Sequence, residues 1–109
     1  MPGREIAAAR LERLRDEADS VVSAVLDGEG AVSVEARHAA FAGRADDPAV
    51  SRYLDVVRRH AYRVTDADFE SLRAAGLDDD EIFELTVAAA LGAGMERLRA
   101  GLSLLDREP

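Results

Sequence analysis

An alanine-rich segment without charge is the feature that most constrains the fold of this chain. Residues 85–95 (LTVAAALGAGM) are apolar or small on every side of a helix, and the acidic run 78–81 precedes them. Asp78 and Glu81 have the spacing of a capping box, and carboxylates in a first helical turn favour the positive end of the helix dipole. The sequence therefore predicts a long central helix over residues 78–105.

Four further helices are expected on the N-terminal side of this one. The first covers residues 4–26 and ends at the glycines of residues 28–30. It carries an apolar seam with a 4-3-4-3-4 spacing, which suits contact with another helix, and the seam consists of Ala7, Leu11, Leu14, Ala18, Val21 and Val25. The seam is too short to specify a free-standing coiled coil, and packing within the chain or against another subunit both remain open.

Capping residues predict the other three helices. Ser33 can begin a helix to residue 42, Asp47 followed by Pro48 can begin one to residue 64, and Thr65 can begin one that stops at Gly76. No segment alternates convincingly between apolar and polar residues. The expected fold class is all-α, with residues 1–27 as an N-terminal helical arm and residues 31–109 as a helical domain.

Composition excludes several classes of function. The 109 residues are 48% hydrophobic, which suits one globular domain, and the 22 acidic and 14 basic residues give a net charge of -8. This charge disfavours nucleic acids and anionic membrane surfaces. The absence of Cys and Lys excludes thiol nucleophiles, disulfides, thiolate metal sites and Schiff bases. No signal-peptide or membrane-spanning run is seen, so a cytoplasmic protein without a cofactor is expected.

Residues 60–85 carry a resemblance to a known family. They read HAYRVTDADFESLRAAGLDDDEIFEL: a short helix closing in an Ala-Gly-Leu turn, an acidic helix start and then the small-residue helix. This order resembles the carboxymuconolactone decarboxylase and alkylhydroperoxidase D family, over residues 33–105 and best over residues 60–102. The resemblance implies an alkylhydroperoxidase D-like helical bundle and a homo-oligomer, commonly a trimer or hexamer.

The chain departs from this family at the redox motif. Peroxidase members carry Cys-x-x-Cys-x-x-x-His ahead of the glycine turn, because a thiolate attacks the peroxide and a second thiol resolves the product. With Gly76 as the register, these positions fall on Ala61, Val64 and Asp68. Peroxidase chemistry through this motif is therefore excluded. The main expectation is a non-redox binding or assembly module.

An acid–base lyase or decarboxylase acting on a small anionic organic acid is the alternative. His60, with an ordinary pKa near 6.5, would be the acid or base, and Glu84 its carboxylate partner. Arg59 and Arg63, with Tyr62, would bind the substrate's carboxylate. Each residue also has a structural interpretation: a half-buried helix histidine, a first-turn glutamate and ion-paired arginines.

A metal site and a DNA-binding regulator are two other functions that the sequence raises and then disfavours. The acidic residues 66–70 and 78–81 suggest helix caps and no metal site, because the spacing of an EF-hand loop is missing. The short helices of residues 48–76 allow a helix-turn-helix regulator, but the acidity of the chain argues against DNA binding.

Overall fold

The computed structural model of the chain describes residues 2–105, with side chains from residue 6 onward, and it is all-helical over this range. The elements, in chain order, are α1 (Pro2–Asp27), α2 (Val34–Phe41), α3 (Pro48–His60), the 3-10 turn η1 (Ala61–Arg63), α4 (Asp66–Ala74) and α5 (Asp79–Leu105). The expected fold class is confirmed at the level of all-α.

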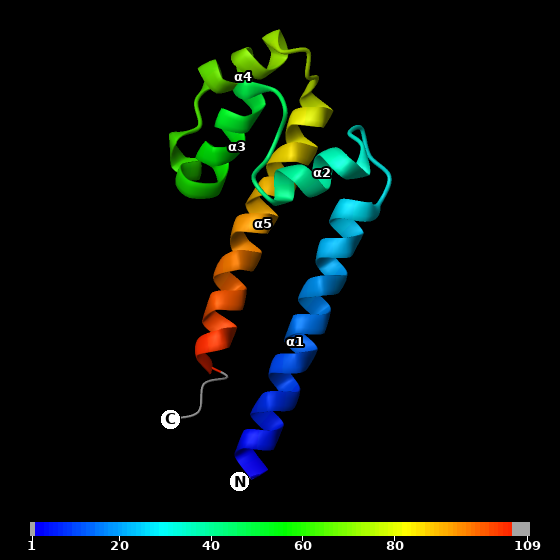
Figure 1. Cartoon of the computed structure of the whole chain (residues 1–109), viewed down its shortest axis with the longest axis vertical. Helices are drawn as coiled ribbons and strands as arrows, with labels where there is room; N and C mark the ends of the chain where they lie inside the picture. The colour runs from blue at the N-terminus through cyan, green and yellow to red at the C-terminus, as the bar shows by residue number, and fades with distance from the viewer. Residues whose placement is uncertain (1, 106–109) are drawn as a thin grey trace.

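The two long helices form an antiparallel hairpin, and the short ones form a head at one end of it (Figure 1). The molecule measures 59 × 28 × 19 Å, with a radius of gyration of 16.9 Å. A compact domain of this length has a radius of gyration near 13 Å. The chain is therefore elongated, because the outer halves of α1 and α5 extend beyond the head.

Local capping explains where the helices begin. Ser33 accepts a hydrogen bond from the amide of Ala36 at 3.1 Å, and Asp47 accepts one from the amide of Ala49 at 2.8 Å. In the predicted capping box of α5, the amide of Asp78 donates to Glu81 at 3.1 Å and the amide of Glu81 donates to Asp78 at 2.8 Å. These caps satisfy amides that have no partner within their helix.

The glycine turn before α5 is also as predicted. Gly76 has a φ of 99°, a left-handed conformation that an L side chain rarely adopts. The next amide, that of Leu77, reaches back 3.2 Å to the carbonyl of Leu72. This arrangement is a helix C-cap in which the apolar residue after glycine folds back onto the helix.

The third helix is shorter than expected. It was predicted to continue to residue 64, but α3 ends at His60 and η1 follows. Val64 then adopts an extended conformation, with its side chain packed against the core. The amide of Thr65 donates to Asp68 at 2.8 Å, which starts α4 in a new direction.

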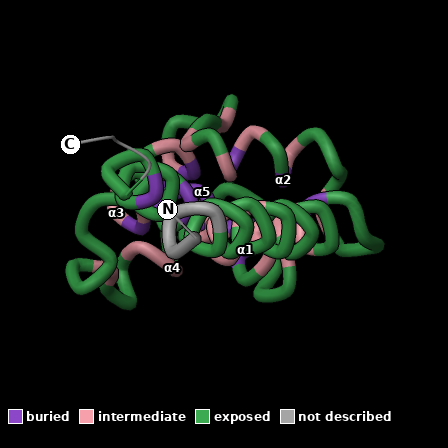
Figure 2. The backbone as a smooth tube through the Cα atoms, turned by 90° about the horizontal axis from the view of Figure 1, so that it is seen from below, coloured by how far each residue is buried: buried purple, intermediate pink, exposed green. Residues whose placement is uncertain are grey.

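The core lies in the head, where α5 crosses α2 and α3. Leu26, Leu54 and Leu72 are its largest fully buried side chains, and Ala88 and Ala89 of α5 are completely buried. The first half of α5 is therefore central to the core on one side, whereas Phe83 and Ala90 on its other side are exposed. Most of α1 is exposed, with partly buried residues recurring along its coil (Figure 2).

Candidate functional site

His60, Tyr62 and Arg63 lie together at the end of α3, on the surface. His60 and Tyr62 are in edge-on contact, with 5.9 Å between ring centroids, and the guanidinium of Arg63 lies 5.6 Å from the centroid of the Tyr62 ring. Tyr62 is 79% exposed, and His60 and Arg63 are exposed as well. The structure brings these three predicted residues together, but in contact with water.

Glu84 holds a loop. Its two carboxylate oxygens accept hydrogen bonds from the amides of Ala31, at 2.7 Å, and Val32, at 2.8 Å. These bonds, first that of Val32 and then that of Ala31, lower the pKa of Glu84, with a smaller contribution from Arg37. Among the described residues no contact joins Glu84 to His60. The predicted acid–base pair is not assembled.

The arginines beside His60 are ion-paired. Arg59 contacts Asp55 at 2.9 Å, one helical turn earlier. Arg58 reaches across to α5: it donates to the carbonyl of Phe41 at 2.6 Å and to Glu96 at 2.5 Å. Both line a polar cavity of about 390 Å³ with Arg97. Ion pairing, which was the structural interpretation of Arg59, is what the structure contains, and the bridging role of Arg58 was missed.

A second group of polar residues fixes the C-terminal end of α1. Arg37, only 5% exposed, donates to the carbonyl of Val25 at 3.1 Å. His38 and Asp27 are 2.7 Å apart. Arg37 was not predicted from the sequence, and its position among the small residues of α2 gave no signal of burial. These contacts join α1 to α2, and through Glu84 to α5.

One side of α5 carries exposed apolar residues and small residues without any charge. We call it the α5 outer face: Phe83, Val87, Ala90, Gly94, Leu98, Gly101 and Leu105. Spacings of three and four residues place all seven on one side of the helix, and none is charged. Phe83 is 68% exposed, Leu98 41% and Leu105 69%.

The three glycines of α5 differ in their surroundings: one is packed against the rest of the chain, and two lie on the α5 outer face. A Cβ at Gly92 would collide with the carbonyl oxygen of Phe41, so close packing within the chain requires glycine there. A Cβ at Gly94 or at Gly101 would meet nothing within 4 Å. Since glycine costs about 1 kcal/mol relative to alanine inside a helix, no contact within the chain accounts for these two.

The apolar seam of α1 is divided. Leu11, Ala18 and Val25 are partly buried, whereas Leu14 and Val21 are 51% and 54% exposed. Arg99 of α5 approaches Asp19 at 3.5 Å, which marks one edge of the hairpin.

The exposed part of the seam lies on the other edge. The line along which α1 and α5 touch separates Val21 from Asp19 on α1, and it separates Leu98 from Arg99 on α5, because successive residues are turned by 100° around a helix. Leu14 and Val21 of α1 therefore lie on the same edge of the hairpin as Leu98 of α5.

The exposed area is large for the size of the chain. The solvent-accessible surface is 7452 Å². A compact monomer of 11.7 kDa has roughly 5,900 Å². The difference, about 1,500 Å², exceeds the roughly 800 Å² that each partner contributes to a standard protein–protein interface.

Comparison with known proteins adds no family to these observations. No family model matches the sequence, and neither a curated protein nor a solved structure matches it. Within residues 2–105 no helix has the length and hydrophobicity needed to cross a bilayer. The same residues contain no group of three or more histidine, aspartate or glutamate side chains arranged to hold a metal ion.

Proposed function

We propose that this chain is a non-redox assembly module that pairs with a second copy of itself through the α5 outer face. The observation that supports this most is a charge-free, exposed helix face whose two glycines have no role within the chain. The resemblance to carboxymuconolactone decarboxylase-like proteins, which implies a homo-oligomeric scaffold, agrees with it. The absence of cysteine leaves such a scaffold without thiol chemistry.

The energetics favour a helix as the partner. Full burial of a large apolar side chain contributes about 1.5–3 kcal/mol, and Phe83, Leu98 and Leu105 are all available. Gly94 and Gly101 lie between them on the same face and allow two helix backbones to approach closely. The same face of a twofold-related copy offers this combination of large and small residues, as self-complementary contacts in dimers require.

The α1 helix extends the proposed contact. Leu14 and Val21 lie on the same edge of the hairpin as Leu98, so two hairpins would pack as four helices with apolar residues facing inward. A dimer satisfies this arrangement, and so does the twofold contact of a hexamer.

The lyase alternative has less support. Both oxygens of Glu84 are engaged by loop amides, and His60 and Tyr62 are exposed. Glu84 is occupied by backbone amides and His60 is exposed to solvent, so the two side chains do not converge as an acid–base site requires.

Light scattering on the full chain tests the proposal. The unmodified chain is expected to have at least twice the monomer mass, and Leu98→Arg to have the monomer mass, because it places a charge at the centre of the contact. Leu104→Arg is the matched control: Leu104 is 62% exposed but lies about 100° round the helix from Leu105, off the face. It should keep the oligomer. A monomeric unmodified chain at high concentration would contradict the proposal.

A further inference from the structure

The α5 outer face has the same spacing when it is read in either direction. From Phe83 to Leu105 its residues follow a 4-3-4-4-3-4 spacing, and Gly94 is the middle residue. On a straight helix these positions turn by only about 40° in all, so the face stays on one side over a length of about 33 Å. An antiparallel copy of α5 therefore meets each residue of this face at the level of another residue of the same face.

The sizes of these residues fit an antiparallel copy. The residues at the same level, one from each chain, are Gly94 with Gly94, Ala90 with Leu98, Val87 with Gly101, and Phe83 with Leu105. Two crossing helices are closest at the crossing point and diverge on both sides of it. The pairs become larger in the same order, from two glycines at the centre to phenylalanine with leucine at the ends.

A parallel copy fits this face less well. It places every residue opposite its own copy, so two Leu98 side chains meet one turn away from the two Gly94 residues. Two leucines hold the helix axes further apart than two glycines do, and a gap remains at Gly94. A parallel copy also brings together the positive ends of both α5 helices and both copies of the exposed Asp80, and like charges repel.

The position of α1 distinguishes the two orientations as well. Val21 of α1 lies on the same edge of the hairpin as Leu98. An antiparallel pair has a twofold axis perpendicular to the helices, which places both α1 helices on the same side of the two α5 helices. Since Asp19 contacts Arg99, Val21 is about level with residue 97 and lies near that axis, close to its own copy. In a parallel α5 pair the α1 helices lie on opposite sides, and Val21 stays in water.

The α1 helix of a second copy does not cover the face in place of α5. With both heads at the same end, α1 ends at Asp27, which is about level with residue 91 of α5. This arrangement leaves Phe83, Val87 and Ala90 uncovered. A second α5 helix is long enough to cover the whole face.

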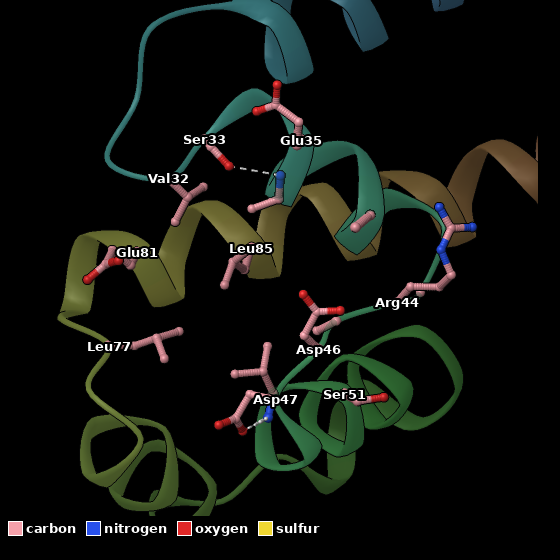
Figure 3. A pocket seen from close by; sticks show the side chains of 15 residues that line it. Val32, Ser33, Glu35, Arg44, Asp46, Asp47, Ser51, Leu77, Glu81 and Leu85 are labelled. Carbon is pink, nitrogen blue, oxygen red and sulfur yellow. Dashed lines mark hydrogen bonds between the residues drawn. The ribbon is translucent and has the colours of Figure 1, made fainter.

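The opposite side of α5 is occupied by the chain itself. Leu85 belongs to the core and, with Val32 and Leu77, lines an open cavity of about 780 Å³ between α2, α3 and α5 (Figure 3). Gly92 packs against the backbone at Phe41. A second α5 helix therefore approaches from the outer face.

We propose that the second copy binds antiparallel, with a twofold axis between the two Gly94 residues. This inference rests on the proposed self-association through the α5 outer face and adds the orientation of the partner. The half of each α5 helix that extends beyond its own head then lies against the head end of the other α5 helix. The contact accounts for an elongated chain, because each copy covers the extended half of the other.

Disulfide formation between engineered thiols tests the orientation, because the chain contains no cysteine of its own. A Val87→Cys chain and a Gly101→Cys chain are mixed and oxidised. The mixed disulfide is expected to exceed either symmetric one at least about tenfold, because residues 87 and 101 of different chains are level, whereas the two copies of residue 87 are about 21 Å apart. Glu35→Cys, on an exposed position of α2, is the control for disulfides formed by random collision.

A spin label gives a second measurement that leaves the contact unchanged. Asp80 is exposed and lies beyond the level of Leu105 in the antiparallel pair. Two nitroxides attached to Asp80→Cys chains are expected about 40 Å apart in this pair, and under about 25 Å apart in a parallel one.

The outcomes separate this inference from self-association itself. Symmetric disulfides that equal the mixed one, no disulfide above the Glu35→Cys control, or a label distance under about 25 Å would each overturn the antiparallel orientation. If Leu98→Arg still makes such a chain monomeric, self-association through the α5 outer face stands and only its orientation is wrong. A monomeric unmodified chain would contradict both proposals.

Discussion

Gly92 and Gly94 are separated by one residue of α5 and have opposite surroundings. We expect Gly92→Ala to lower the free energy of unfolding by about 1–3 kcal/mol, because its Cβ would push against the backbone at Phe41. Gly94→Ala, placed in the Leu98→Arg chain to remove self-association, should raise the free energy of unfolding by up to about 1 kcal/mol through helix propensity. Urea unfolding measures both.

The same Gly94→Ala change has a second consequence when Leu98 is retained. If the glycine allows close approach of another helix, the added methyl group should weaken association while it stabilises the separate chain. Sedimentation equilibrium measures the association constant. An unchanged constant would show that Gly94 is not in the contact.

Glu84 predicts how stability depends on pH. Its pKa in the folded chain lies below the ordinary value of 4.5, because the amides of Val32 and Ala31 donate to it. The carboxylate then contributes stability that is present above the unfolded pKa and is lost as pH falls through the folded pKa. Thermal unfolding between about pH 6 and pH 3 should show a smaller acid-induced loss of stability for Glu84→Gln than for the unmodified chain.

Glu70→Gln is the control for this measurement, since Glu70 is exposed on α4. Its loss of stability with acid should follow that of the unmodified chain. If Glu84→Gln and the unmodified chain lose stability in parallel, the loop contact does not contribute in the way the geometry indicates.

Single residues differ in how far their roles could be read from the sequence. Ser33, Asp47 and the Asp78–Glu81 pair act on amides within three residues, so their capping roles were predictable. Glu84 acts on amides 52 and 53 positions away, and Arg58 on a carbonyl 17 positions away. Such partners depend on how the helices pack, which no local pattern contains.

The helices show a similar limit. The seam of α1 correctly predicted a helix that needs a partner: α1 packs against α5 of the same chain, and Leu11, Ala18 and Val25 are partly buried. The spacing alone did not show that Leu14 and Val21 would remain exposed, because one neighbouring helix covers only part of such a seam. Likewise, the cap at Thr65 was predicted, but the end of α3 at His60 depends on Val64 returning to the core.

The attachment of α1 can be tested through Arg37. Arg37→Met keeps most of the buried volume but removes the hydrogen bond to the carbonyl of Val25. Since a hydrogen bond from a charged group contributes about 1.5–3 kcal/mol, amide hydrogen exchange over residues 22–27 should accelerate at least about tenfold. Exchange in α4 should not change.

Arg52→Met provides the comparison, because Arg52 is an exposed arginine of α3. It should leave exchange in α1 unchanged. If both variants accelerate exchange equally, the effect belongs to the loss of positive charge and not to the contact with α1.

At the scale of the whole molecule, the all-α class followed from helix periodicity and capping, but the shape did not. An elongated hairpin and a compact bundle use the same helices, and they differ in how far α1 and α5 overlap the head. The α5 outer face was visible in the sequence only as part of a segment that is apolar all round. Its exposure depends on which sides of α5 the other helices cover, so the sequence predicted a buried helix and could not distinguish burial within one chain from burial between two.

The elongated shape and the exposed face together predict that stability depends on protein concentration. If pairing of two chains contributes to the stability of the fold, each tenfold rise in protein concentration should add about 1.4 kcal/mol to the free energy of unfolding of the pair. The thermal midpoint should then rise by several degrees. The Leu98→Arg chain should instead unfold at a midpoint that does not depend on concentration, and the Leu104→Arg chain should behave as the unmodified one. A midpoint of the unmodified chain that stays constant over a hundredfold range of concentration would mean that the head alone stabilises the fold, and that Phe83, Leu98 and Leu105 remain in water.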